Sequence, residues 1–70
     1  MNQDLIDANL AILPRHIAEY TRWANHAEGR ATEAREAGRK SQARMAAGMA
    51  RDYRVMVADA TARLTAFSSI

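Results

Sequence analysis

Residues 6–34 of the chain are IDANLAILPRHIAEYTRWANHAEGRATEA. Apolar side chains recur in this segment at steps of three and four, a spacing that keeps them on one stripe of a helix. The stripe consists of Ile6, Leu10, Leu13, Ile17, Tyr20, Ala24, Ala27, Ala31 and Ala34. Such a long, narrow stripe is typical of a helix that packs along a partner helix, as in a coiled coil. The alanines of its second half favour a close approach of the two backbones.

The strongest turn signal in the middle of the chain is the segment 37–41, AGRKS. Gly38 can adopt the left-handed conformation that ends a helix, and Ser41 is a good N-cap for a following helix. A short turn between two long helices predicts an all-α antiparallel two-helix hairpin. The predicted elements of this single domain, residues 1–70, are a helix at 3–37, a turn at 38–41 and a helix at 42–67.

Pro14 interrupts the first predicted helix, because proline lacks the N–H group that would bond to the carbonyl of Leu10. The apolar stripe keeps its spacing across the proline, so we expect a kink near Pro14. The alternative is a break that splits off a short segment at 4–13. At the start of this helix, Asn2 or Asp4 can act as the N-cap.

The second predicted helix also has one apolar face. Its members are Met45, Ala46, Met49, Ala50, Tyr53, Met56, Val57, Ala60, Leu64 and Phe67. We expect the three methionines to lie in the core, where flexible thioether side chains fill gaps opposite an alanine-rich helix. Asp59 and Arg63 lie outside this face and form a favourable pair four residues apart.

The apolar arc of the first helix is too wide for one neighbouring helix. A second row beside the stripe carries Leu5, Ile12, His16 and Trp23, and much of it would stay exposed in a lone hairpin. A chain of 70 residues without cysteine also lacks disulfides to support a small core. We therefore expect a homodimer or higher homo-oligomer, with a four-helix bundle as the simplest form and these four residues in the dimer interface.

No sequence pattern indicates catalysis or a cofactor. The serines have no credible base beside them, and paired acids, a Gly-rich phosphate loop and a nucleophile elbow are absent from the sequence. His16 and Glu19 have the spacing of metal ligands on a helix, but His26 lies about 15 Å further along the axis. We expect no enzyme activity, no cofactor and no metal site.

The sequence also favours a cytoplasmic protein with no membrane partner. No apolar run approaches the roughly 20 residues of a membrane span. Residues 1–4, MNQD, carry an acid where a signal peptide carries basic residues. The lack of cysteine fits a reducing compartment.

Positive charge concentrates around the predicted turn, at Arg35, Arg39, Lys40 and Arg44. A GC-rich coding sequence is sufficient to explain the abundance of arginine and alanine, but arginine is also the better donor to carboxylates and phosphates. We predict a small non-catalytic regulatory protein that binds, blocks or bridges a host or cellular protein with an acidic surface through this basic tip. The alternative is a nucleic-acid or nucleotide binder, which is less favoured because no aromatic residue is interleaved for base stacking.

The two-helix layout resembles in outline the Rop-type RNA-binding hairpin dimers, although no motif matches residue by residue. The chain is also similar in size and style to the very small helical proteins with which phages and mobile elements occupy a host protein. This second resemblance implies an inhibitor of a host protein, and it concerns size and style alone.

Overall fold

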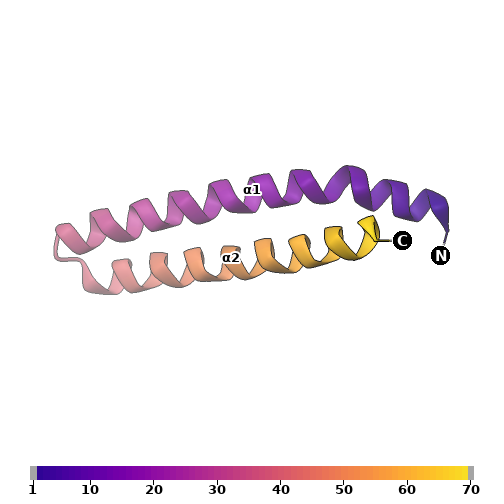
Figure 1. Ribbon diagram of the computed structural model, residues 1–70. Helices are drawn as coiled ribbons and strands as arrows, with labels where there is room; N and C mark the ends of the chain where they lie inside the picture. The colour runs from indigo at the N-terminus through magenta and orange to yellow at the C-terminus, as the bar shows by residue number, and fades with distance from the viewer. Residues whose placement is uncertain (1, 70) are drawn as a thin grey trace.

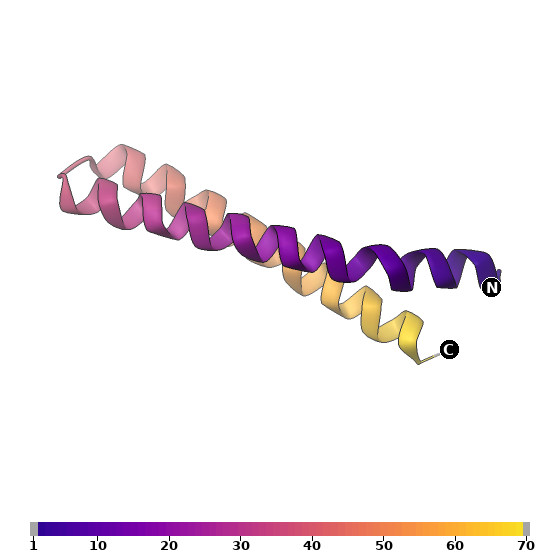
Figure 2. The ribbon, with the colours of Figure 1, turned by 90° about the horizontal axis from the view of Figure 1, so that it is seen from above.

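The computed structural model describes residues 2–69 as two long antiparallel helices joined by a short turn (Figure 1). Helix α1 spans Gln3–Glu36 and helix α2 spans Lys40–Ser68. The hairpin is a rod with extents of 52 × 13 × 13 Å. From above, the two helices cross at a shallow angle (Figure 2), as helices do when their side-chain ridges interlock in the coiled-coil manner. The predicted all-α antiparallel hairpin is confirmed.

The core follows the predicted stripe of α1, because every position of that stripe is buried or half-buried. Ala24, at the middle of the stripe, is fully buried. Helix α2 supplies a matching stripe at steps of three and four. Its members are Ala43, Ala46, Ala50, Tyr53, Val57, Ala60, Leu64 and Phe67. Within the described residues, the buried part of this core therefore consists of alanines together with Ile6 and Leu13.

The expectation that Met45, Met49 and Met56 lie in the core is wrong. All three are exposed, and Met45 retains 68% of its accessible surface. The buried positions of both stripes near the turn are alanines, whose short side chains allow the helices to pack closely. Helix α2 is therefore rotated so that Ala43 is buried and the methionines lie to one side of the seam.

The turn is held by two backbone hydrogen bonds at the end of α1. The N–H of Arg39 donates to the carbonyl of Ala34 at 2.8 Å, and the N–H of Gly38 donates to that of Arg35 at 3.1 Å. This pair of bonds defines a Schellman motif. Gly38 has a φ of 75°, so its predicted left-handed conformation is confirmed.

The two helices begin differently. Asn2 caps α1, because its Oδ1 accepts a hydrogen bond of 2.7 Å from the N–H of Asp4. The prediction that Ser41 caps α2 is wrong. The Schellman motif brings the chain round so quickly that α2 begins at Lys40, and the N-cap is Arg39, whose side chain makes no capping bond.

Helix α1 continues without a break through Pro14, so the alternative of a separate N-terminal segment is wrong. Figure 1 shows a gentle bend of α1 toward its N-terminal end. The bend accommodates a proline ring and a carbonyl, that of Leu10, which has no N–H donor four residues later.

Candidate interaction surfaces

One side of the hairpin exposes large apolar side chains from both helices. Trp23 and Met49 line one shallow depression there, and His16 and Met56 line another. We call this side the Trp23 face, and its members are Leu5, Ile12, His16, Trp23, Met45, Met49 and Met56. Leu5, Ile12 and Trp23 are exposed and His16 is half-buried, as the width of the arc predicted. The part contributed by α2 was missed because its methionines were assigned to the core.

A chain of aromatic contacts connects the Trp23 face to the seam. The ring centroids of His16 and Tyr20 are 5.9 Å apart, and those of Tyr20 and Trp23 are 5.8 Å apart. Trp23 then meets Tyr53 of α2 edge to face at 5.6 Å. Trp23 is thus fixed on one side by aromatic packing, while 43% of its surface stays exposed.

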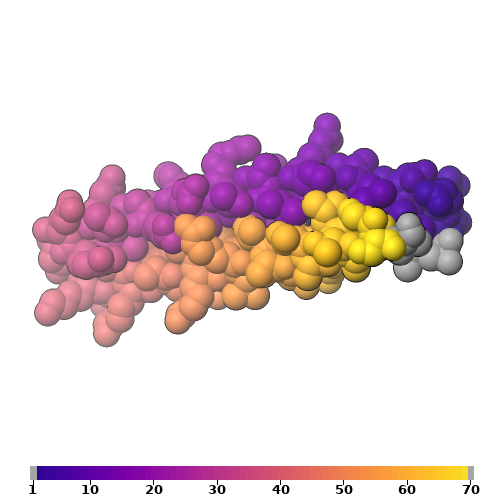
Figure 3. Space-filling view, in the orientation of Figure 1, coloured from indigo at the N-terminus to yellow at the C-terminus, as the bar shows by residue number. Residues whose placement is uncertain are grey.

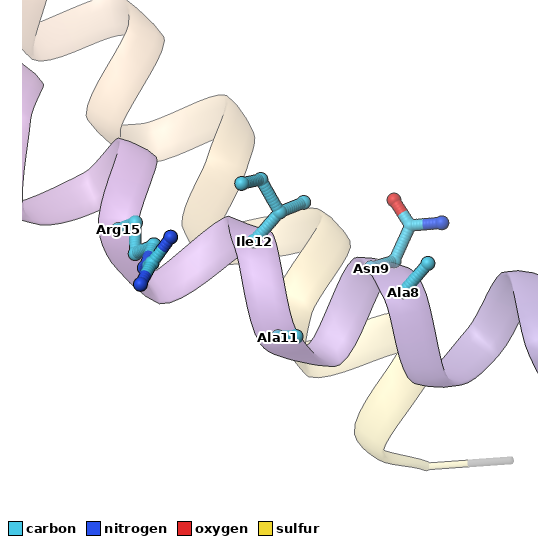
Figure 4. A pocket seen from close by; sticks show the side chains of 5 residues that line it. All are labelled: Ala8, Asn9, Ala11, Ile12 and Arg15. Atoms are coloured by element: carbon cyan, nitrogen blue, oxygen red, sulfur yellow. The ribbon is translucent and has the colours of Figure 1, made fainter.

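A shallow hollow near the N-terminal end of α1 belongs to the same exposed row. Its lining side chains are those of Ala8, Asn9, Ala11, Ile12 and Arg15. Figure 4 shows that Ala8, Asn9 and Ile12 project to the same side of α1. Because one helix alone lines the hollow, it lacks the enclosing walls of a small-molecule site.

A second surface lies on the other side of the seam. Its depression has a floor of alanines and is lined by Arg35 of α1 together with Arg51 and Arg54 of α2. We call the side with these three arginines the arginine face. Glu33 and Ala37 line a depression that continues the Trp23 face. Helix periodicity places Arg35 on the other side of the seam from these two residues. The two faces therefore lie on opposite sides of the hairpin.

The arginines of this face differ in their partners. Arg54 bridges the helices, because its Nε donates to Glu28 Oε1 at 2.7 Å and its Nη2 donates to Asn25 Oδ1 at 3.1 Å. Both side chains of this ion pair are about half exposed, so it contributes little to stability. The other ion pair among residues 2–69 is the predicted Asp59–Arg63 pair, at 3.2 Å. Arg35 and Arg51 take part in neither.

The four predicted tip residues are all exposed, but they do not form a single patch. Arg35 lines the depression of the arginine face, whereas Arg39 lines a depression beside Met45. Lys40 and Arg44 lie at the start of α2, where the first turn contains no acid. Figure 3 shows long side chains projecting from this end of the rod. The positive end of the α2 dipole and the basic side chains thus coincide.

The described residues form no enclosed reactive centre. Between residues 2 and 69, no group of three or more His, Asp or Glu side chains is placed to hold a metal ion. In the same part of the chain no charged or polar residue is buried, and no helix is long and apolar enough to cross a membrane.

No protein-family model, curated protein or solved structure matches the chain. The resemblance to Rop-type hairpins is accordingly one of layout. A two-helix layout by itself assigns no function, because one fold serves many functions. Function is therefore inferred from the chemistry of the two faces and the tip.

Proposed function

We propose that the protein is a non-catalytic regulator that binds an acidic surface of another protein and thereby blocks or bridges that partner. The binding surface consists of the basic tip and the adjoining arginine face. The observation that carries this proposal is the position of Arg35 and Arg51, which come from different helices and line one depression. Neither has an acidic partner among the ion pairs of the described residues.

The chemistry of this depression favours carboxylates. A guanidinium group presents parallel N–H donors that match both oxygens of a carboxylate, and Arg35 and Arg51 together offer two such groups. The alanine floor, formed by Ala31, Ala47 and Ala50, lets an incoming side chain approach the helices closely. The acid-free first turn of α2 adds a positive helix end nearby.

The arrangement of the aromatic rings supports a protein partner over a nucleic acid. Proteins that bind single-stranded nucleic acid interleave basic residues with aromatic rings on which bases stack. Here the rings of Tyr20, Trp23 and Tyr53 form one cluster that extends to the Trp23 face. The depression of the arginine face is lined by alanine, threonine and charged residues. Phosphate contacts alone would leave such a binder without base stacking.

The test captures partners with the purified protein from a lysate of the source cells, with and without nuclease. Three double variants each remove two positive charges. They are Arg39→Ala with Lys40→Ala at the tip and Arg35→Ala with Arg51→Ala in the depression. The matched control is Arg15→Ala with Arg22→Ala, at exposed positions of α1 away from the tip and the arginine face. We expect a protein to be captured after nuclease treatment, lost with the first two variants and retained with the control.

Salt dependence separates the two classes of partner. For a captured protein, the loss should be concentrated in one or two arginines at about 2 kcal/mol or more each. For a nucleic acid, each lost phosphate contact should lower the slope of log affinity against log salt by about 0.7 to 0.9. Recovery of nucleic acid alone, with no protein left after nuclease, would contradict the proposal.

A further inference from the structure

The hairpin buries small side chains and exposes large ones. Seven of the nine buried hydrophobic residues among residues 2–69 are alanines, while Trp23, Ile12 and the methionines of α2 remain exposed on one side. This inverts the usual distribution of apolar residues between core and surface. An exposed apolar strip of this kind marks a surface that is covered by a partner.

The accessible surface of the chain is larger than that of a compact monomer of the same mass. A compact monomer of 7.8 kDa has about 4,400 Å² of accessible surface. The hairpin has 5183 Å². The excess of about 800 Å² follows from the elongated shape of the hairpin, which leaves long faces of both helices uncovered.

The charge pattern of α1 is complementary to that of a second, antiparallel copy of the same helix. The row that flanks the seam on the Trp23 side advances at steps of four and three, and it consists of Ile12, His16, Glu19, Trp23, His26, Arg30 and Glu33. When two such rows meet antiparallel about a two-fold axis between residues 24 and 25, Glu19 lies opposite Arg30 of the partner subunit. His16 then lies opposite Glu33 of the partner subunit, and Trp23 opposite its His26.

We infer that two hairpins associate antiparallel through their Trp23 faces, with α1 packed on α1 of the partner subunit in this register. Each of the charged contacts occurs twice because the interface is two-fold symmetric. Glu19, His26, Arg30 and Glu33 are all exposed in the single hairpin and therefore available for these contacts.

The neighbouring registers are less favourable. A shift of the antiparallel pair by one heptad places His16 opposite His26 and Glu19 opposite Trp23, which removes every complementary charge contact. A shift by a second heptad restores a contact between His16 and Glu19. That register places Arg30 opposite Leu5 of the partner subunit, so the contact between Glu19 and Arg30 is lost.

The same register brings the methionines of α2 together. Trp23 contacts Tyr53 in the hairpin. This contact aligns the two helices, so each residue of α2 has a known position along the axis of α1. With α2 packed on α2 of the partner subunit, Met49 of one copy and Met56 of the other lie within about 3 Å of the same level along the axis. The exposed apolar side chains of the Trp23 face, except Leu5, are therefore covered in one step, and the arginine faces point outward.

Charge reversal tests the register. Dimerisation is measured by sedimentation at low micromolar concentration, and helicity is checked by circular dichroism. Glu19→Arg places the new arginine opposite Arg30 of the partner subunit at both symmetry-related contacts. We therefore expect the affinity of the dimer to fall roughly tenfold. Arg30→Glu should have the same effect, and the double variant that combines them should restore the affinity. Glu36→Arg, which makes the same charge change at an exposed position outside the row, should leave it unchanged.

Two further measurements define the geometry. Leu5 lies beyond the overlap in this register, so Leu5→Ala should leave the dimer unchanged while Ile12→Ala weakens it. Spin labels on Arg39→Cys, in a chain without other cysteines, should be about 44 Å apart along the axis in the antiparallel dimer. A parallel dimer would place the same labels within the combined width of the two hairpins.

A chain that stays monomeric at high concentration would overturn the inference and assign the Trp23 face to a different protein. A dimer whose affinity is insensitive to Glu19→Arg, or that the double variant does not restore, would overturn the register. Failure of this inference can be distinguished from failure of the proposed function through Arg35 and Arg51, which lie on the arginine face, outside this interface. Arg39 lines the depression beside Met45, so the dimerisation of the tip variant Arg39→Ala with Lys40→Ala is measured as well.

Discussion

Trp23 of α1 packs edge to face against Tyr53 of α2, with their ring centroids 5.6 Å apart and their planes at 60°. Tyr53 belongs to the seam between the helices, whereas Trp23 belongs to the exposed face. One contact therefore couples the packing of the hairpin to the surface that we assign to dimerisation. A change at Trp23 is expected to affect both.

Trp23→Ala should lower the free energy of unfolding of the single hairpin by about 1 to 2 kcal/mol, because it removes an aromatic pair and part of the apolar packing. It should also loosen the dimer by a few kcal/mol if Trp23 is a buried anchor there. Urea titration followed by circular dichroism, at a concentration where the chain is monomeric, measures the first effect, and sedimentation measures the second. Trp23→Phe keeps an aromatic edge and should recover most of the hairpin stability. Unchanged unfolding in Trp23→Ala would show that the Tyr53 contact contributes nothing.

The glycines offer the same substitution with opposite expected effects. Gly38 has a φ of 75°, so Gly38→Ala should destabilise the hairpin by about 1 kcal/mol even though a methyl group meets no atom within 4 Å. Gly29 lies inside α1 with equally open space around it, so Gly29→Ala should stabilise the hairpin by about 0.5 to 1 kcal/mol. Thermal unfolding of both variants compares them directly. Equal effects would rule out backbone conformation as the cause.

Enlarging the seam should separate the helices. Ala27 is 3% exposed and lies between the two backbones, so Ala27→Leu should cost about 1 to 3 kcal/mol through overpacking. Ala62→Leu adds the same side chain at an exposed position of α2 and should change stability by less than about 0.5 kcal/mol. Both values come from urea titration. If Ala27→Leu were as stable as the control, the seam would not be in close contact.

A substitution at Arg39, the uncapped N-cap of α2, should change stability and binding in opposite directions. Arg39→Asp supplies a carboxylate at an N-cap position that has no side-chain acceptor and should stabilise the hairpin by about 1 kcal/mol. It also reverses one charge of the basic tip, so it should weaken capture of an acidic partner. Arg39→Ala, which removes the charge without adding a cap, controls for the first effect. A stabilised variant that still binds fully would exclude Arg39 from the binding surface.

The sequence predicted the features that depend on local patterns. The stripe of α1 and the left-handed Gly38 follow from spacing and from residue chemistry at single positions, and the same chemistry limited the cap of α1 to Asn2 or Asp4. The rotation of α2 could not be predicted in the same way, because methionines and alanines alternate on adjacent positions and both are apolar. Only the close packing of alanine against alanine decides which of the two stripes is buried.

The candidate surfaces show the same limit. The Trp23 side of α1 could be predicted, because the apolar arc of this helix is wider than one neighbouring helix can cover. The position of Arg35 and Arg51 in one depression could not be predicted. These residues are far apart in sequence, and placing them together requires the register of the two helices. The Schellman bonds at the turn set that register, and they also move the start of α2 ahead of Ser41.

The gradation of side-chain size along the seam has a consequence for the order of folding. Ala34 and Ala43 flank the turn, so contacts at this position along the hairpin close short loops. Contacts at the open end close a loop of nearly the whole chain. The entropy cost of closing a loop grows with its length, and the apolar surface available for burial grows in the same direction, from alanine near the turn to Leu13, Leu64 and Phe67 further out. The hairpin can therefore close progressively from the turn outward, with larger side chains added where the chain must be held over a longer distance.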